Sequence, residues 1–175
     1  AVETYRKNIG NEIVCDDIEN IDLSTIPDAD VVIGGFPCQG FSVANMNRVV
    51  EDERNVLYKY FVKIVETKKP KFFVAENVKG LLSIGGGKVI EKIVSDFEEV
   101  GYEVRYKLLN AATFGVPQSR ERVIILGTRR DLGIEVDFPP RQTHAKFPVG
   151  NLKKFVSIGD VLKDVPNPDK PHGLL

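Results

Sequence analysis

The sequence predicts an α/β fold with a doubly wound, mostly parallel sheet and an antiparallel, hairpin-like pair of strands near the C-terminal side. One observation is that apolar strand-like runs alternate with amphipathic helix-like stretches through the middle of the chain, which favours parallel strands covered by helices. Another is that two strand-like runs, 103–109 and 123–127, are joined by a short connection through Gly115 and Pro117. Such a short connection favours antiparallel pairing of these two strands with each other.

The N-terminal half begins with a helix-like segment over residues 2–8. Residues 30–35 form an apolar run without alternation, which predicts a strand buried on both faces. Residues 55–65 place apolar side chains on one helical face, and Pro70 follows as a stop signal. The next strand is predicted over 71–75. These elements have the strand–helix–strand order of a parallel unit.

The C-terminal half is less regular. A second helix is predicted over 89–100, ended by Gly101. From Phe138 onward prolines become frequent and periodicity fades, so an irregular tail is expected, with one short helix over 157–162.

Composition limits the class of function. Lys and Arg number 24 and Asp and Glu 25, for a formal net charge of −1, so no global basic field indicates nucleic acid, although a local basic groove is compatible with this balance. The two cysteines, Cys15 and Cys38, have no spacing typical of a zinc site or a disulfide framework. Cys15 follows an apolar pair and is interpreted as a small buried hydrophobe. No membrane-length apolar run or signal-peptide pattern is present, so an intracellular, reducing location is expected.

Two candidate catalytic side chains follow strand-like runs. Cys38 stands in a Pro-Cys-Gln sequence after the run over 30–35, and Glu76 follows the run over 71–75. In an open parallel sheet, ligands bind beyond the carboxyl ends of the strands. We therefore expect a thiol and a carboxylate in one cleft, a pair suited to covalent catalysis on an electron-poor ring or carbonyl.

Three ordered motifs resemble those of a known family. They are Phe36-Pro37-Cys38-Gln39, Glu76-Asn77-Val78 and Gln118-Ser119-Arg120-Glu121-Arg122-Val123. In this order, each beside a predicted strand, they resemble the motifs of the cytosine carbon-5 methyltransferases that use S-adenosylmethionine, over nearly the whole chain. The resemblance implies the Rossmann-like fold of S-adenosylmethionine-dependent methyltransferases and methyl transfer to carbon 5 of cytosine.

The resemblance implies that Cys38 is the nucleophile and Glu76 its partner. Carbon 5 of cytosine is a poor nucleophile until a thiolate adds to carbon 6. Cys38 would add as the thiolate, so it needs a lowered pKa or a proton acceptor. Glu76, as a protonated carboxyl, would donate to ring nitrogen 3 and stabilise charge that develops on the ring.

The resemblance gives four further residues a role at the target base. Arg122 would contact the oxygen at carbon 2, and Arg120 would position a loop or a phosphate. Asn77 would orient the backbone around Glu76. Gln118 belongs to the same motif as the arginines, which otherwise would be solvated or paired with a neighbour such as Glu121.

The cofactor residues are assigned with two alternatives open. Asp17 and Ile18 look like the family's adenine-contacting pair, but they also fit a turn after a short strand. Leu57 matches a cofactor-lining position, but it also fits a helix core. The resemblance further implies that Phe36 and Pro37 line the cofactor edge.

The resemblance also divides the chain. We expect residues 1–140 to be a catalytic core without its first strand and glycine-rich loop. Residues 141–175 would be an irregular tail that leads toward a target-recognition region. The chain by itself is therefore expected to be inactive, as a truncation or as one part of a divided protein whose complementary chain supplies the other segments.

The expected substrate is double-stranded DNA, with the target cytosine flipped out of the duplex because its ring face is unreachable in the stack. A restriction–modification role would suit such an enzyme. Two alternatives stay open. One is the related methyltransferase that acts on cytosine in transfer RNA. The other is an amidase with a Cys-Glu-Lys site, which would need no S-adenosylmethionine and gives no role to Arg120 and Arg122.

Overall fold

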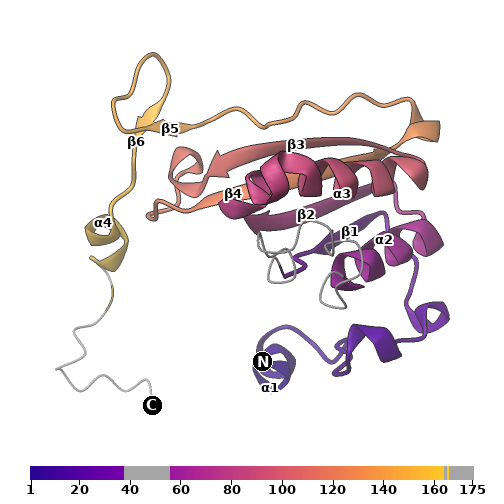
Figure 1. The fold of residues 1–175 in the computed structure, drawn as a ribbon. Helices are drawn as coiled ribbons and strands as arrows, with labels where there is room; N and C mark the ends of the chain where they lie inside the picture. Colours follow the sequence, from indigo (N-terminus) through magenta and orange to yellow (C-terminus); the bar gives the residue numbers. More distant parts are fainter. Residues whose placement is uncertain (38–55, 164, 166–175) are drawn as a thin grey trace.

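The computed structural model describes residues 1–37, 56–163 and 165 of the 175-residue chain. Its centre is a four-stranded sheet with two helices against one face (Figure 1). In spatial order the strands are β1 (Val31–Gly34), β2 (Phe72–Val78), β4 (Glu121–Arg129) and β3 (Tyr102–Asn110).

The sheet is mixed. β1 pairs with β2 in parallel, whereas β4 pairs antiparallel with both β2 and β3. The α/β class and the antiparallel pair near the C-terminal side are confirmed. The sheet is not mostly parallel over the described strands, because β4 returns from β3 through residues 111–120, a connection too short for a parallel crossover.

Helices α2 (Val56–Lys68) and α3 (Lys88–Glu99) share one face of the sheet. The rings of Phe61 and Phe97, one from each helix, lie 5.9 and 4.2 Å from the ring of Phe73 in β2. The rings approach the sheet closely because Gly34 and Gly127 lack a side chain: an added Cβ would lie 2.6 Å from Phe61 and 1.9 Å from Phe73. This aromatic cluster is the centre of the core.

One expectation about β1 is wrong. The strand was predicted to be buried on both faces, but Val31 is 45% exposed and Ile33 78% exposed. Val32 packs on the helix side of the sheet. β1 lies at the edge of the described sheet, and the described residues leave its outer face largely open, so its apolar run does not mean two-sided burial.

The N-terminal segment begins with α1 (Val2–Asn8), as predicted. It continues through two 3-10 helices, η1 (Ile18–Asn20) and η2 (Leu23–Thr25), each capped by an aspartate. Cys15 is exposed rather than buried. It lies in an irregular stretch between α1 and η1, where the neighbouring Val14 is also 70% exposed, so local apolarity did not lead to burial.

Within the described residues, the connections contain four further 3-10 helices: η5 (Lys79–Leu82), η6 (Ile84–Gly87), η7 (Ala111–Phe114) and η8 (Arg130–Leu132). The tail runs along β3, where Arg105 Nη1 donates to the carbonyl oxygen of Val136 at 3.3 Å. It then forms a short parallel pair, β5 (His144–Ala145) with β6 (Lys153–Lys154), and the helix α4 (Ile158–Leu162) (Figure 1).

The tail is therefore more regular than predicted, although its short helix is confirmed. Ser157 caps α4 in a reciprocal capping box with Asp160. Within the described part of the chain, none of the helices has the length and apolar character that crossing a membrane would require.

Candidate active site

Glu76 lies inside β2, opposite Ile124 of β4, and not after the end of the strand. The predicted strand was too short because pairing with β4 continues as far as Val78 and Arg122. The Glu76 side chain points away from α2 and α3 and is 43% exposed. Its Oε2 lies 3.8 Å from the position that a Cβ of Gly35 would take. The carboxyl ends of β1 and β2 therefore meet, as predicted.

Two arginines converge on this carboxylate. Arg122 Nε lies 2.8 Å and Arg120 Nη2 lies 3.4 Å from the same oxygen, Glu76 Oε1. The Nε of Arg122 is buried, and its N–H is not aligned with any acceptor among the described residues, so the short contact is an ion pair without hydrogen-bond geometry. Half-exposed pairs of this kind contribute only about 0–1 kcal/mol each. Their arrangement is thus better explained by the backbone that holds them than by mutual attraction.

The backbone register decides which side chains meet. Arg122 is opposite Val78, so it shares the sheet face of Glu76, and it also donates from Nη1 to the carbonyl oxygen of Glu121 at 2.8 Å. The side chain of Glu121 instead accepts from Lys79 Nζ at 2.9 Å. Both arginines are therefore ion-paired, as the alternative expected, but their partner is Glu76 and not the carboxylate of Glu121.

Asn77 connects the ends of β1 and β2. Its side chain is only 3% exposed and faces the helix side of the sheet. Its Nδ2 donates to the carbonyl oxygen of Phe36 at 2.9 Å, and its Oδ1 accepts from the amide of Val78 at 2.9 Å. The amide side chain thus holds the segment that leads to Pro37. Cys38 is the next residue in the sequence and lies outside the described residues.

The loop over 111–120 brings Gln118 and Arg120 to this edge. The side chain of Gln118 is exposed. The backbone N–H of Gln118 donates to the carbonyl oxygen of Val116 at 2.8 Å. Sequence reasoning missed Asn110, whose side chain bonds both ends of the loop. The signal that could have found it is an asparagine directly after the strand predicted over 103–109 and before a helical turn, since asparagine is a preferred N-cap residue.

The cofactor candidates come from η1, α2 and the segment that follows β1. Asp17 caps η1 by accepting from the amide of Glu19 at 3.2 Å, and Ile18 is half-buried. The helix η1 contacts α2, whose half-buried Leu57 lies in its first turn. The three candidates therefore come from two touching elements.

Phe36 and Pro37 extend this group toward Glu76. Phe36 is buried, with its ring 6.0 Å from that of Tyr58 and 6.4 Å from that of Phe61. Pro37 is exposed. An exposed carboxylate at Asp17 with half-buried apolar side chains nearby fits an adenosine group, because the carboxylate can accept from an amino group while apolar side chains cover the ring.

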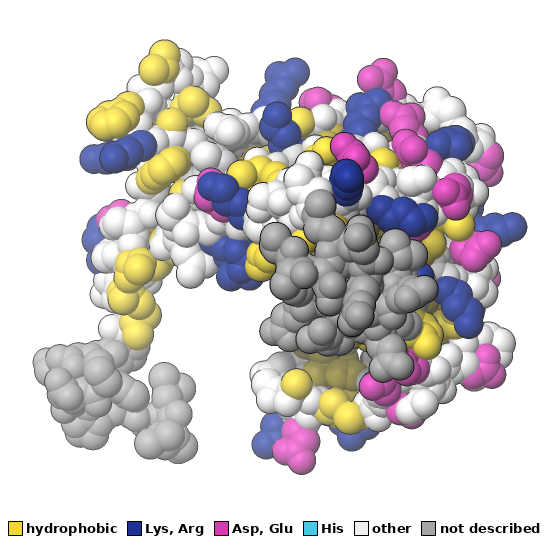
Figure 2. All heavy atoms as spheres, viewed as in Figure 1, with side chains coloured by type: hydrophobic (Ala, Val, Ile, Leu, Met, Phe, Trp, Pro, Cys, Tyr) yellow, Lys and Arg dark blue, Asp and Glu magenta, His cyan; other side chains and the backbone are white. Residues whose placement is uncertain are grey.

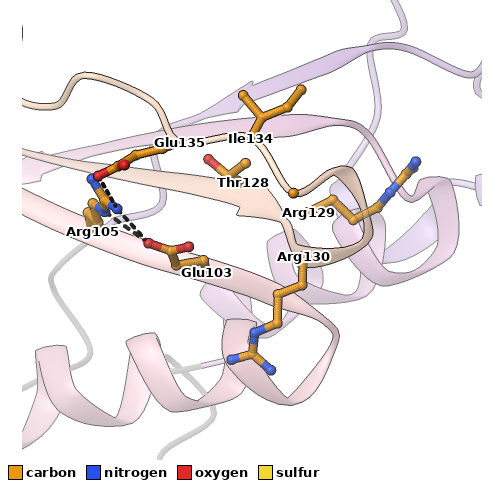
Figure 3. Close-up of a pocket in the computed structure, with 8 residues that line it drawn as sticks. Glu103, Arg105, Thr128, Arg129, Arg130, Ile134 and Glu135 are labelled. Atoms are coloured by element: carbon orange, nitrogen blue, oxygen red, sulfur yellow. Dashed lines mark hydrogen bonds and ion pairs between the residues drawn. The ribbon is translucent and has the colours of Figure 1, made fainter.

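A separate cavity of about 330 Å³ lies toward the other end of the sheet (Figure 3). Three of its charged groups pair with one another: Arg105 Nη2 lies 2.8 Å from Glu103 Oε1 and 3.6 Å from Glu135 Oε1. The hydrogen bonds that Arg105 donates to Glu103 raise the pKa of Arg105. Thr128, also in the lining, is opposite Phe72 at the start of β2. The cavity is thus displaced along β2 from Glu76.

Charge over the visible surface is mixed. Figure 2 shows acidic and basic side chains interspersed on the face it presents. The arrangement agrees with the net charge of −1. The convergence of Arg120 and Arg122 on Glu76 is therefore a local feature.

Comparison with known proteins identifies related chains. The model of the family "C-5 cytosine-specific DNA methylase" matches residues 1–173. The type II methyltransferase M.NgoFVII of Neisseria gonorrhoeae is 47% identical over 100% of this chain and 47% of its own length. M.BspRI of Lysinibacillus sphaericus, also a type II methyltransferase, is 44% identical over 94% of this chain and 38% of its own. The chain thus spans about half the length, or less, of these curated relatives.

Solved structures share the fold. One is the structure of a protein assigned as a DNA modification methyltransferase encoded within an Escherichia coli prophage. The match covers 95% of this chain and 46% of that protein's chain, with a TM-score of 0.72 and 25% identity. The structure of Spodoptera frugiperda DNMT2 matches 79% of this chain and 42% of its own, with a TM-score of 0.59 and 23% identity. The second likeness concerns the fold alone.

Proposed function

The chain belongs to the C-5 cytosine-specific DNA methylase family, and we propose on that basis that it forms the catalytic core of a DNA cytosine carbon-5 methyltransferase. The observation that carries this proposal is the convergence of Arg120 and Arg122 on Glu76 at the carboxyl end of β2. That site adjoins the end of β1, where Pro37 precedes Cys38 in the sequence.

In the proposed reaction the thiolate of Cys38 adds to carbon 6 of a flipped-out cytosine. The electron pair of the ring double bond then makes carbon 5 nucleophilic. S-adenosylmethionine, when bound, supplies the electrophilic methyl group. Methyl transfer would release S-adenosylhomocysteine. Water would then take the proton from carbon 5, and the electrons of that C–H bond would restore the double bond and expel the Cys38 thiolate.

Glu76 and the two arginines suit the polar edge of cytosine. Ring nitrogen 3 and the oxygen at carbon 2 are adjacent on that edge. With the base bound, Glu76 would take up a proton and donate to nitrogen 3 in place of its ion pairs, and Arg122 beside it would donate to the oxygen. Donors placed where charge develops stabilise it without reorganisation. Arg120, which is more exposed than Arg122, would position the loop or a phosphate, together with Gln118.

Asn77 and the cofactor candidates would support this site from the helix side. The bond from Asn77 to Phe36 would hold the segment before Cys38 in place. Asp17 and Ile18 would contact the adenosine part of S-adenosylmethionine. Leu57 would line the same site, with Phe36 and Pro37 at its edge.

We further propose that residues 1–140 are the core and that 141–175 lead toward a target-recognition region. The substrate would be double-stranded DNA, in an intracellular restriction–modification setting like that of the type II relatives. A complementary chain would complete the enzyme if the protein is naturally divided. The family supports DNA over transfer RNA, because its description names a DNA methylase.

The test uses the full-length polypeptide that contains this chain. Transfer of a labelled methyl group from S-adenosylmethionine is measured on mixed-sequence double-stranded DNA and on transfer RNA. We expect label at carbon 5 of cytosine in DNA. Label in transfer RNA alone would support the first alternative. Amide hydrolysis without dependence on S-adenosylmethionine would support the second.

A further inference from the structure

The loop over 111–120 is closed by one side chain. Asn110, the last residue of β3, accepts at Oδ1 from the amides of Ala112, at 3.0 Å, and Arg120, at 3.2 Å. Its Nδ2 donates to Ser119 Oγ at 3.1 Å. The start and the end of the loop are thus bonded to the same amide group.

Arg120 depends on this closure more than Arg122 does. Arg122 lies within β4, between its partners Val78 and Leu109 in the two neighbouring strands. Arg120 precedes the first residue of β4, and the ladder with β3 ends at Asn110 and Glu121. Beyond the ladder, two hydrogen bonds hold the backbone of Arg120. Its N–H donates to Asn110 Oδ1, and its carbonyl oxygen accepts from the backbone amide of Ala111 at 2.9 Å.

The contact that Arg120 makes is sensitive to its position. Its Nη2 lies 3.4 Å from Glu76 Oε1, close to the limit of a hydrogen bond, so a shift of about 1 Å would remove it. We propose that Asn110 is a positioning residue for Arg120, and through it for Glu76, an inference that rests on the proposed function. The Asn110 side chain would fix the backbone of Arg120, as the strand ladder fixes the backbone of Arg122.

The chemistry of the position suggests a matched pair of variants. Asn110→Ala removes all three side-chain bonds. Asn110→Asp keeps oxygens that accept from both amides, and the hydroxyl of Ser119 can donate to the second oxygen. Asp22→Ala is the control, because Asp22 caps η2 by accepting from the amide of Ser24 at 2.9 Å on the amino-terminal side of β1.

The experiment compares these variants in the full-length polypeptide, on DNA. Competent sites are counted by covalent trapping on 5-fluorocytosine, and the turnover rate is expressed per trapped site. We expect Asn110→Ala to lower this rate about tenfold or more, as small misplacements of catalytic groups do. Asn110→Asp should restore most of the rate, and Asp22→Ala should leave it unchanged.

A double-mutant cycle with Arg120→Ala tests the route of the effect. If Asn110 acts through Arg120, Asn110→Ala should cost less than about twofold in the Arg120→Ala background. Losses that multiply in the double variant would overturn the proposal. So would a merely structural outcome, in which Asn110→Ala lowers the melting temperature but not the rate per trapped site.

Amide hydrogen exchange separates this inference from the proposed function. In Asn110→Ala the amides of Ala112 and Arg120 should exchange faster, whether or not the enzyme methylates DNA. If the wild type transfers no methyl group, the proposed function fails, and the exchange result still decides the role of Asn110. Exchange at Arg120 that matches the wild type would overturn that role.

Discussion

Arg122 lies against Glu76 across the antiparallel ladder of β2 and β4, with its Nε 2.8 Å from Glu76 Oε1. Glu76 is opposite Ile124 and Arg122 is opposite Val78, so the two charged side chains are diagonal neighbours on one face. A shift of one residue in this register would move Arg122 to the helix-covered face. The charged site therefore depends on the register of β4.

Replacement of Glu76 tests whether its carboxyl is a catalytic donor. We expect Glu76→Gln and Glu76→Ala each to lower the single-turnover rate of methyl transfer about a hundredfold or more, as removal of one preorganised donor does. The control is Glu121→Gln, which loses only the exposed pair with Lys79 and should stay within about twofold. Near-wild-type rates for both Glu76 variants would refute the assignment.

Cys38 is tested by a covalent trap. A fluorine at carbon 5 of the target cytosine blocks the loss of a proton, so the wild-type enzyme should remain attached to DNA that contains 5-fluorocytosine. Cys38→Ala should form no such adduct and transfer no methyl group, while binding of S-adenosylmethionine stays largely intact. Peptide mapping of the adduct checks the residue. Attachment at any other side chain would contradict the proposed nucleophile.

Asn77 should contribute to stability as well as to the site. Asn77→Leu has a similar volume but leaves the carbonyl oxygen of Phe36 and the amide of Val78 without their bonds to the Asn77 side chain. The free energy of unfolding should fall by about 1–3 kcal/mol, measured by urea denaturation. Asn20→Ala, which removes an exposed bond to Asp16, should change it by less than about 0.5 kcal/mol. Equal midpoints for Asn77→Leu and the wild type would exclude this role.

The 175-residue chain by itself is expected to bind S-adenosylmethionine weakly and to be inactive. It spans 47% of the length of M.NgoFVII, and its candidate cofactor residues come from η1, α2 and the segment after β1, where they would hold only the adenosine side. Binding through the adenosine side alone would lack hydrogen bonds to the rest of the cofactor. Each such bond contributes about 1 kcal/mol, so the loss of several would cost orders of magnitude in affinity. Calorimetric titration and a methyl-transfer assay measure both properties. Micromolar affinity together with turnover by the isolated chain would show the expectation to be wrong.

Local patterns predicted the elements well where they were periodic. The helix over residues 2–8 has the bounds expected, and α3 (Lys88–Glu99) differs from its prediction by one residue at each end. The end of β2 was missed because Glu76 and Asn77 interrupt the apolar pattern while the ladder with β4 continues. The length of a strand depends on the strands that pair with it, so a local sequence pattern does not predict where the strand ends.

Burial was harder to predict than secondary structure. Cys15 and Ile33 were both interpreted as buried because of apolar neighbours, and both are exposed. Whether an apolar side chain is buried depends on which element covers it. The covering element comes from a segment distant in the sequence, so the local sequence around an apolar residue does not predict whether it is buried.

The sequence by itself determined the family, through three ordered motifs, and named the residue types that its chemistry needs. Only the tertiary structure decided that Arg120 meets Glu76 from 44 positions away, and that Asn110 closes the loop between β3 and β4. The reason is physical: residue identity and short periods reflect local backbone preference, whereas strand order and register arise from long-range packing and hydrogen bonding. The motifs identified the residues of the site, whereas the positions of their side chains depend on the place of β4 between β2 and β3.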